Sequence, residues 1–302
     1  MASTKSEILA KVIRTVKPLI TGMDLQGQRV GQAMLSRVKA VPKNMKISHA
    51  DHCPLNAEWI LPKDAPEDVV MLYMHGGAYR TGDLIASRGL IAYLCKACGI
   101  KALSFEYRLA PEFTYPAALE DAIEAYLWLL KQGYSNDRIA MIGDSAGGGL
   151  IIAATLALKD MGKPLPAALM CISPWVDLTE TSRSHAVREK EDPLVDSDYL
   201  MRAALEYSGE ESLFHPYISP AFGSFAPPFP EVLIHVGTRE VLFDDAIHME
   251  RKLKEGGVPV TLEVFEGMWH VWHVFNVPEA EQALLQIREF MRRKLQVELD
   301  EQ

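Results

Sequence analysis

The sequence has no long uninterrupted apolar run. Its richest stretch covers residues 150–158 and stops at Lys159, well short of the roughly 18–20 residues of a membrane-spanning helix. Charged residues near the N-terminus (Lys5, Glu7, Lys11 and Arg14 among them) interrupt the apolar segment that a signal peptide would need. We therefore expect a cytoplasmic protein without a membrane span.

An excess of positive charge is also missing. The 302 residues include 31 Lys and Arg against 40 Asp and Glu, so the formal net charge is −9. This balance does not favour non-specific binding to nucleic acid or to anionic lipid. Apolar residues make up 48% of the chain, which is typical of a folded protein and argues against disorder. The length fits one large domain or two small ones.

Cysteine is scarce, with four residues in the chain. Cys95 and Cys98 have the spacing of a redox motif or of half a zinc site, but no second pair of ligands at similar spacing exists. A redox pair normally opens a helix, whereas this pair closes an apolar helical pattern and is followed by Gly99. We expect structural thiols, no metal site and no cofactor.

Short β-rich segments alternate with helical ones through most of the chain. The expected strands cover 69–74, 101–105, 138–142, 167–172, 232–236 and 258–265, and the expected helices cover 85–98, 117–132, 146–160, 244–255 and 278–297. Several of these strands are continuous apolar runs, as in sheets covered by helices on both faces. The alternation predicts an α/β fold with a mostly parallel sheet, and 48–61 should add antiparallel strands at one edge.

Two regions fall outside this alternation. Residues 1–45 carry a helical pattern with no strand after it, and residues 176–225 are polar and proline-rich, with a short helix expected at 197–207. Such insertions usually lie above the C-terminal edge of a sheet, where ligands bind. We interpret them as two parts of a cap over a catalytic domain made of 46–175 and 226–302. A surface excursion without a role is the alternative. Asp192, Pro193 and 197–207 are candidates for the pocket entrance.

The segment Gly143-Asp-Ser145-Ala-Gly147 stands between an expected strand and an expected helix. This is the context of a nucleophile elbow, in which a serine occupies a tight turn and the flanking glycines leave room for the backbone. The helix N-terminus also directs free N–H groups toward an anion that forms beside Ser145. A glycine-rich phosphate loop is the alternative, but the Gly-Lys-Ser/Thr ending of such loops is absent from this segment.

Two consecutive glycines follow the expected strand 69–74, in the run His75-Gly76-Gly77-Ala78. Glycines at this point allow backbone N–H groups to face outward without obstruction by side chains. We expect the N–H groups of Gly76 and Gly77, together with that of Ala146, to form an oxyanion hole. His75 is a chemical candidate for a catalytic base, but we favour a structural role in which its hydrogen bonds fix the loop.

Together, these two motifs and the run Tyr107-Arg-Leu-Ala-Pro-Glu112 resemble the hormone-sensitive-lipase family of α/β-hydrolase esterases. Their order and intervals match the family pattern from about residue 55 to the C-terminus. The resemblance implies a sheet of eight strands flanked by helices, with a cap formed by an N-terminal helical arm and an insertion after the sixth strand. It also implies that short acyl chains are preferred over triglycerides.

The remaining two members of a catalytic triad should follow the serine in the order acid, then base. His270 falls in the expected loop between the last strand and the last helix, and it matches the family's histidine after a Gly-Met step. His273 is its chemical competitor. The family's acidic run Asp-Pro-Leu-x-Asp reads Glu240-Val-Leu-Phe-Asp244 here. We favour Glu240 over Asp244 as the acid, and expect Asp244 and Asp245 to cap the next helix.

These assignments predict a serine carboxylesterase with a Ser145–Glu240–His270 triad. Hydrolysis of a lactone, carbamate, amide or thioester is the alternative for the same triad, and a ligand receptor that has lost catalysis is a more distant one. The expected strand 258–265 is too apolar to form a bare edge of the sheet. We therefore expect a homodimer paired through this strand, with a small ester as the only other partner.

Overall fold

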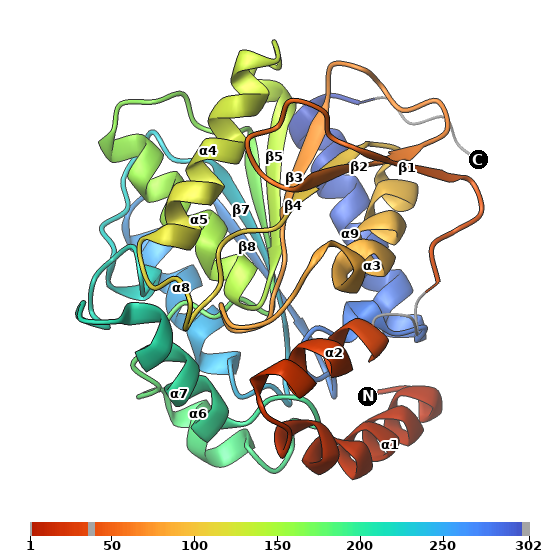
Figure 1. Cartoon of the computed structure of the whole chain (residues 1–302), viewed down its shortest axis with the longest axis vertical. Coiled ribbons are helices and arrows are strands. Elements are labelled where there is room, and N and C mark those ends of the chain that lie inside the picture. Colours follow the sequence, from red (N-terminus) through yellow and green to blue (C-terminus); the bar gives the residue numbers. More distant parts are fainter. Residues whose placement is uncertain (1, 36–39, 298–302) are drawn as a thin grey trace.

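An eight-stranded sheet forms the centre of the protein (Figure 1). The computed structural model describes residues 2–35 and 40–297. Residues 1 and 36–39 of the expected segment 1–45, and residues 298–302 of the expected segment 226–302, lie outside the described residues. The strands are β1 (Met45–His49), β2 (Ala57–Pro62), β3 (Val70–Met74), β4 (Ala102–Phe105), β5 (Ile139–Asp144), β6 (Ala168–Ile172), β7 (Glu231–Gly237) and β8 (Val260–Phe265). Their spatial order is β1-β2-β4-β3-β5-β6-β7-β8.

The pairing of the strands confirms the expected mostly parallel sheet. Strand β2 pairs antiparallel with both β1 and β4, which forms the expected antiparallel edge. The remaining pairs, from β4 across to β8, are all parallel. The C-terminal ends of β3, β5, β6 and β7 therefore meet at one edge of the sheet, where a site can draw on several loops.

Helices cover both faces of this sheet. They are α1 (Thr4–Thr21), α2 (Leu25–Leu35), α3 (Leu84–Cys98), α4 (Ala117–Lys131), α5 (Ala146–Asp160), α6 (Arg183–Arg188), α7 (Ser197–Ser208), α8 (Phe243–Glu255) and α9 (Pro278–Leu295). Figure 1 shows α3 and α9 on one face, α4, α5 and α8 on the other, and α1, α2, α6 and α7 at one end of the molecule. Within the described residues, no helix has both the length and the apolar character of a membrane span.

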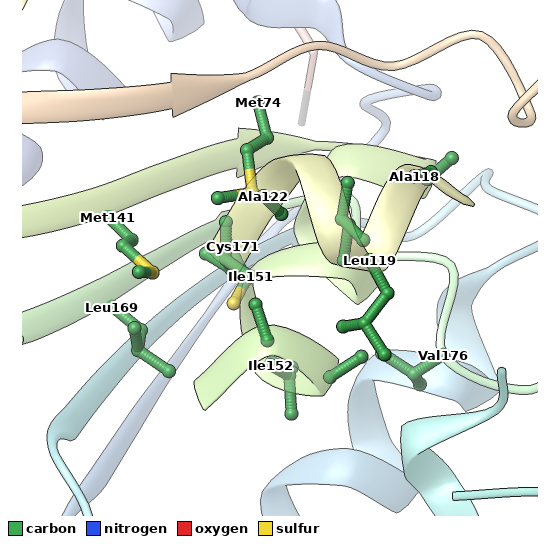
Figure 2. Packing of buried hydrophobic residues seen from close by; sticks show 14 of the residues in the cluster. Met74, Ala118, Leu119, Ala122, Met141, Ile151, Ile152, Leu169, Cys171 and Val176 are labelled. Atoms are coloured by element: carbon green, nitrogen blue, oxygen red, sulfur yellow. The ribbon is translucent and has the colours of Figure 1, made fainter. Parts of the chain in front are cut away.

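The packing of β3 shows why its sequence is apolar at every position. Val70, Leu72 and Met74 belong to the core on the α4–α5 side, whereas Met71 and Tyr73 belong to the core on the α3–α9 side. Successive side chains of a strand point to opposite faces, so a strand covered on both sides needs an apolar residue at each position. Figure 2 shows part of the first core, with Met74, Met141, Leu169 and Cys171 of the strands near Ile151 and Ile152 of α5.

The Cys95–Cys98 pair lies at the buried end of α3. Both side chains are fully buried, and Gly99 ends the helix in the left-handed conformation (φ 69°), with its N–H donating to the carbonyl oxygen of Cys95. Burial raises the pKa of Cys98 to about 12, so this thiol stays protonated at neutral pH. These positions confirm the expected structural role.

Asp244 and Asp245 do not cap α8, and this expectation was wrong. The residue that precedes the helix is Leu242, and no side chain caps the helix there. Asp244 instead accepts a hydrogen bond from the backbone N–H of Ser184 at 2.9 Å. Asp245 is fully buried and lies 3.3 Å from Nε2 of His185. Both carboxylates therefore join α8 to the 176–225 segment.

Candidate active site

Ser145 occupies the turn between β5 and α5, in a backbone conformation that non-glycine residues rarely adopt (φ 54°, ψ −121°). Gly143 and Gly147, on either side of it, are required because the neighbouring backbone leaves no room for a side chain at these positions. A Cβ on Gly143 would lie 2.3 Å from the carbonyl oxygen of Gly147, and one on Gly147 would lie 2.1 Å from that of Met74. The N–H of Ser145 donates to the carbonyl oxygen of Ile172 at 2.8 Å. The serine is thus held at the C-terminal edge of the sheet.

His270 and Glu240 meet Ser145 at this edge. Nε2 of His270 lies 2.9 Å from Oγ of Ser145, and Nδ1 lies 3.0 Å from Oε2 of Glu240. Because a carboxylate accepts hydrogen bonds, this contact places the imidazole proton on Nδ1 and leaves Nε2 able to accept the hydroxyl proton of Ser145. Ser145 and His270 are each 7% exposed, and Glu240 is fully buried.

The two competing residues lie elsewhere. His273 is fully buried, and its Nε2 is 3.2 Å from Nδ1 of His235 on β7. Asp244 is bonded to Ser184, as described above. The structure therefore brings together Ser145, His270 and Glu240, and it gives His273 and Asp244 other partners.

Ser173 connects the loops of Glu240 and His270, a role that the sequence analysis missed. Its Oγ donates to Oε1 of Glu240 at 2.9 Å and accepts from the N–H of Val271 at 3.1 Å. The residue is fully buried and directly follows β6. A lone serine without a motif carries no recognisable signal. Its position at the end of a strand next to β7 is the one clue that the sequence contains.

The pKa of His270 reflects two opposed effects. Burial alone lowers it, but the hydrogen bond and charge of Glu240, together with the charges of Asp192 and Asp144, outweigh burial and raise the pKa above its ordinary 6.5. Burial raises the pKa of Glu240, and the interaction with His270 offsets part of that rise. The neutral imidazole is the form that accepts a proton. Because the pKa of His270 is raised, its neutral form becomes protonated at a higher pH than that of an ordinary histidine when the solution is acidified.

Gly76 does not offer a free N–H, which corrects one expectation about the oxyanion hole. Its N–H donates to Oδ1 of Asp144 at 3.0 Å. The hydroxyl of Tyr73 donates to the same oxygen. A Cβ on Gly76 would also lie 2.4 Å from Oδ2 of Asp144, so the two segments are in close contact. Gly76 thus anchors the loop to the residue before the serine.

The N–H groups of Gly77, Ala78 and Ala146 are the free donors near Ser145. None of the three donates to a protein acceptor within residues 2–35 and 40–297. Gly77 has a φ of +122°, which favours glycine, and a Cβ there would lie 2.2 Å from the carbonyl oxygen of Thr81. Gly77, Ala78 and Ser145 all line the same cavity.

His75 fixes this loop in the expected way. Its Nδ1 donates to the carbonyl oxygen of Gly76 at 2.8 Å, and its ring stacks on that of Tyr107 with 4.1 Å between the centroids. The hydroxyl of Tyr107 donates to the carbonyl oxygen of His75 at 2.7 Å. Burial lowers the pKa of His75, so the imidazole is neutral near pH 7.

A cavity of about 330 Å³ opens at Ser145 and His270. Both regions outside the strand–helix alternation contribute to its wall. The first provides Ile13 and Val16 of α1, and the second provides Leu194, Val195, Tyr199 and Leu200. The expected entrance role of 197–207 thus has support at Tyr199 and Leu200. Asp192 and Pro193 are buried and do not line the cavity, so that part of the expectation was wrong.

Known proteins are similar to this one in sequence and in fold. A family described as alpha/beta hydrolase fold matches residues 71–274. A solved esterase of the bacterial hormone-sensitive lipase family is 35% identical, with a TM-score of 0.92 over 98% of this chain and 100% of its own. The chain belongs to the hormone-sensitive-lipase family of α/β hydrolases.

Two further proteins of known name are similar to this hydrolase. An acetyl-hydrolase of Streptomyces hygroscopicus is 42% identical over 243 residues, which cover 80% of each chain. The esterase EstE5, solved after soaking with p-nitrophenyl butyrate, is 36% identical, with a TM-score of 0.92 over 98% of this chain and 100% of its own. The chain is accordingly an ester-hydrolysing enzyme of the carboxylesterase class.

Proposed function

We propose that this enzyme is a serine carboxylesterase that hydrolyses short-chain acyl esters through an acyl-enzyme on Ser145. The observation that carries the proposal is the pair of contacts from His270, 2.9 Å to Oγ of Ser145 and 3.0 Å to Oε2 of Glu240. They lie at the wall of a cavity large enough for a small ester. The two contacts have the geometry that a nucleophile, its base and an orienting acid require.

In the first half-reaction, His270 takes the hydroxyl proton while Oγ of Ser145 attacks the ester carbonyl carbon. Glu240 holds the Nδ1–H and stabilises the imidazolium that forms. The tetrahedral intermediate then breaks its bond to the alkoxy oxygen, and His270 gives its proton to the departing alcohol. In the second half-reaction, water attacks the acyl-enzyme with His270 again as the base. The carboxylic acid leaves, and Ser145 recovers its proton.

The oxyanion of each tetrahedral intermediate is assigned to the N–H groups of Gly77, Ala78 and Ala146. Their lack of protein acceptors and their place beside Ser145 support this assignment. Backbone donors that are already in place need no reorganisation when charge develops, and loss of one typically costs about 3–4 kcal/mol of transition-state stabilisation. Gly76 does not donate to the oxyanion but holds the loop of Gly77 and Ala78 in place through its hydrogen bond to Asp144.

Residues 1–45 and 176–225 are assigned to the two parts of a cap that closes the acyl site. Their helices lie at the same end of the molecule (Figure 1), and both regions line the cavity. A volume of about 330 Å³ is at the low end for ligand pockets, which favours a short acyl chain. The names of the similar proteins, an acetyl-hydrolase and an esterase soaked with a butyrate ester, fit this size.

A series of p-nitrophenyl esters from acetate to laurate tests the proposed substrate class. We expect kcat/KM to peak at roughly C4–C6 and to fall steeply for longer chains, because these exceed the closed pocket. Amide, thioester and carbamate analogues with the same acyl group serve as matched controls for the bond that is cleaved. A rate that rises toward laurate contradicts the short-chain assignment, and the absence of any turnover favours the receptor alternative.

Strand β8 is assigned to a homodimer interface. It lies at the edge of the sheet with β7 as its neighbour, and it begins at Val260 rather than at Val258 as expected. Val264 is 45% exposed, and Val260 and Leu262 are partly exposed. An apolar edge strand with free backbone groups can pair with the same strand of a second copy.

Light scattering over a range of concentrations tests this dimer. We expect a mass of twice 33.7 kDa, and a monomer for the Val264→Lys variant, because a lysine at the edge opposes pairing. Leu285→Lys is the matched control, since Leu285 is also exposed but lies on α9. A wild-type monomer at every concentration would rule the interface out.

A further inference from the structure

Asp192 is a buried carboxylate to which the mechanism above gives no role. It lies between α6 and α7 and is 2% exposed. Its Oδ1 accepts the N–H groups of Leu194 at 2.9 Å and Val195 at 3.2 Å, and its Oδ2 accepts the N–H of Val241 at 3.2 Å. All three partners are donors, and hydrogen bonds of this kind favour the ionised form of the carboxylate.

These three bonds connect the wall of the pocket to the loop of the triad acid. Leu194 and Val195 line the cavity at Ser145. Val241 directly follows Glu240, whose carboxylate contacts His270. One side chain therefore fixes the position of the cap segment relative to the loop from which Glu240 reaches the imidazole. Removal of its oxygens would free both segments at once.

The charged groups around Asp192 come from three parts of the fold. His270 faces it from the loop after β8, and Glu240 faces it from the loop after β7. Lys17 of α1 contacts the backbone of its segment, with Nζ 2.5 Å from the carbonyl oxygen of Val195 and 3.5 Å from that of Asp192. Asp144, next to the serine, acts on the same imidazole. The imidazole of His270 thus contacts one carboxylate, that of Glu240, and is subject to the charges of two more, Asp192 and Asp144.

The electrostatic effect of Asp192 on the site has a defined sign. Burial raises the pKa of Asp192, and the charge of His270 and the three backbone donors offset only part of this rise. In return, the charge of Asp192 raises the pKa of His270 and that of Glu240. A negative charge near His270 stabilises the imidazolium, which is the form that arises in the transition state.

We propose that Asp192 is a positioning residue of the hydrolytic site, which holds the loop of Glu240 against the pocket wall and presents a further negative charge to His270. The inference rests on the proposed function, since it assigns His270 as the base. Asp192 does not line the cavity, so it acts through Glu240 and His270 rather than on the substrate.

The Asp192→Asn variant tests this role, because it keeps the shape of the side chain, removes the charge and replaces one acceptor oxygen by a donor. The readout is the pH profile of kcat/KM with p-nitrophenyl butyrate. We expect the acid limb, which lies above pH 6.5 in the wild type, to move to lower pH by about half a unit or more. We also expect kcat on the plateau to fall about 10-fold or more, because Glu240 is less well held.

Two further variants separate charge from geometry. Asp192→Glu keeps the charge, so its acid limb should stay near the wild-type position even where kcat falls. Asp244→Asn removes a carboxylate from the first turn of α8, which is bonded to Ser184 and not to the site, and this variant should keep the wild-type limb and rate. Should Asp192→Asn fail to fold by circular dichroism, Asp192→Ser, which retains an acceptor oxygen, takes its place.

A second readout does not need turnover. In the Ser145→Ala protein, the imidazole of His270 can be titrated by NMR with and without Asp192→Asn, and we expect the same downward shift of its pKa. An Asp192→Asn protein with an unmoved limb and an unmoved titration overturns the proposal, whatever happens to kcat. Failure of the proposed function gives a different result, namely no esterase activity in the wild type while the NMR titration still reports on Asp192.

Discussion

Replacement of Ser145 by alanine is expected to lower kcat for p-nitrophenyl butyrate by about 10⁴-fold or more. The variant keeps the cavity and the oxyanion donors but has no oxygen that can be acylated beside His270. The small activity that remains in such variants comes from substrate binding and oxyanion stabilisation alone. Steady-state kinetics at mildly alkaline pH, where His270 is neutral, provide the measurement.

Ser212→Ala is the matched control for this result. Ser212 is exposed in the 176–225 segment, and its Oγ bonds locally to the N–H of Phe214. We expect this variant to keep the wild-type rate. Equal thermal stability of the two variants would show that loss of activity in Ser145→Ala is chemical and does not come from unfolding. A Ser145→Ala enzyme with more than about one-hundredth of the wild-type kcat contradicts the serine mechanism.

The second large effect is expected for Glu240→Gln, about 10³–10⁴-fold in kcat. An amide at this position can donate to Nδ1 of His270, which would favour the tautomer with the proton on Nε2 and prevent Nε2 from accepting the serine proton. The imidazolium would also lose its counter-charge. Oε1 of Glu240 accepts bonds from Ser173 and from the N–H of Gly237, so an amide in its place would keep its oxygen on these donors and direct its NH2 group at His270.

Asp244→Asn is the discriminating partner of this experiment. The carboxylate of Asp244 accepts the N–H of Ser184 and makes no contact with His270 among the described residues, so we expect a kcat within about twofold of the wild type. The opposite outcome, an inactive Asp244→Asn and an active Glu240→Gln, would assign the acid to Asp244. The two variants remove the same functional group from neighbouring positions, Glu240 in the loop after β7 and Asp244 in the first turn of α8, which makes them a close comparison.

The sequence was most informative where local rules decide the structure. The elbow at Ser145 follows from glycines placed between a strand and a helix, and the contacts of Gly143 and Gly147 show why no larger residue fits. The alternation of strands and helices gave the element boundaries to within about two residues. One departure is β8, which begins at Val260 rather than at Val258, since the N–H of Val258 bonds to the carbonyl oxygen of Leu253 at the end of α8.

The sequence was least informative where distant segments meet. The bond from Gly76 to Asp144 depends on the register of β3 and β5, in which Met74 lies opposite Gly143. The positions of Asp244 and Asp245 in the sequence predict helix caps, but in the folded chain their carboxylates contact Ser184 and His185 instead. Asp192 likewise accepts a hydrogen bond from the N–H of Val241, which lies 49 positions away in the sequence. Local sequence patterns do not predict such contacts between distant segments.

The nucleophilic role of Ser145 is tested most directly by covalent labelling. Diethyl p-nitrophenyl phosphate should react at Oγ of Ser145, with formation of the oxygen–phosphorus bond and release of p-nitrophenolate, and peptide mass spectrometry locates the label. We predict one diethylphosphoryl group per active chain, on Ser145, with loss of esterase activity in proportion to labelling. Inactivation with Ser145 unlabelled, or full labelling of Ser145 with activity retained, would contradict a mechanism through this serine.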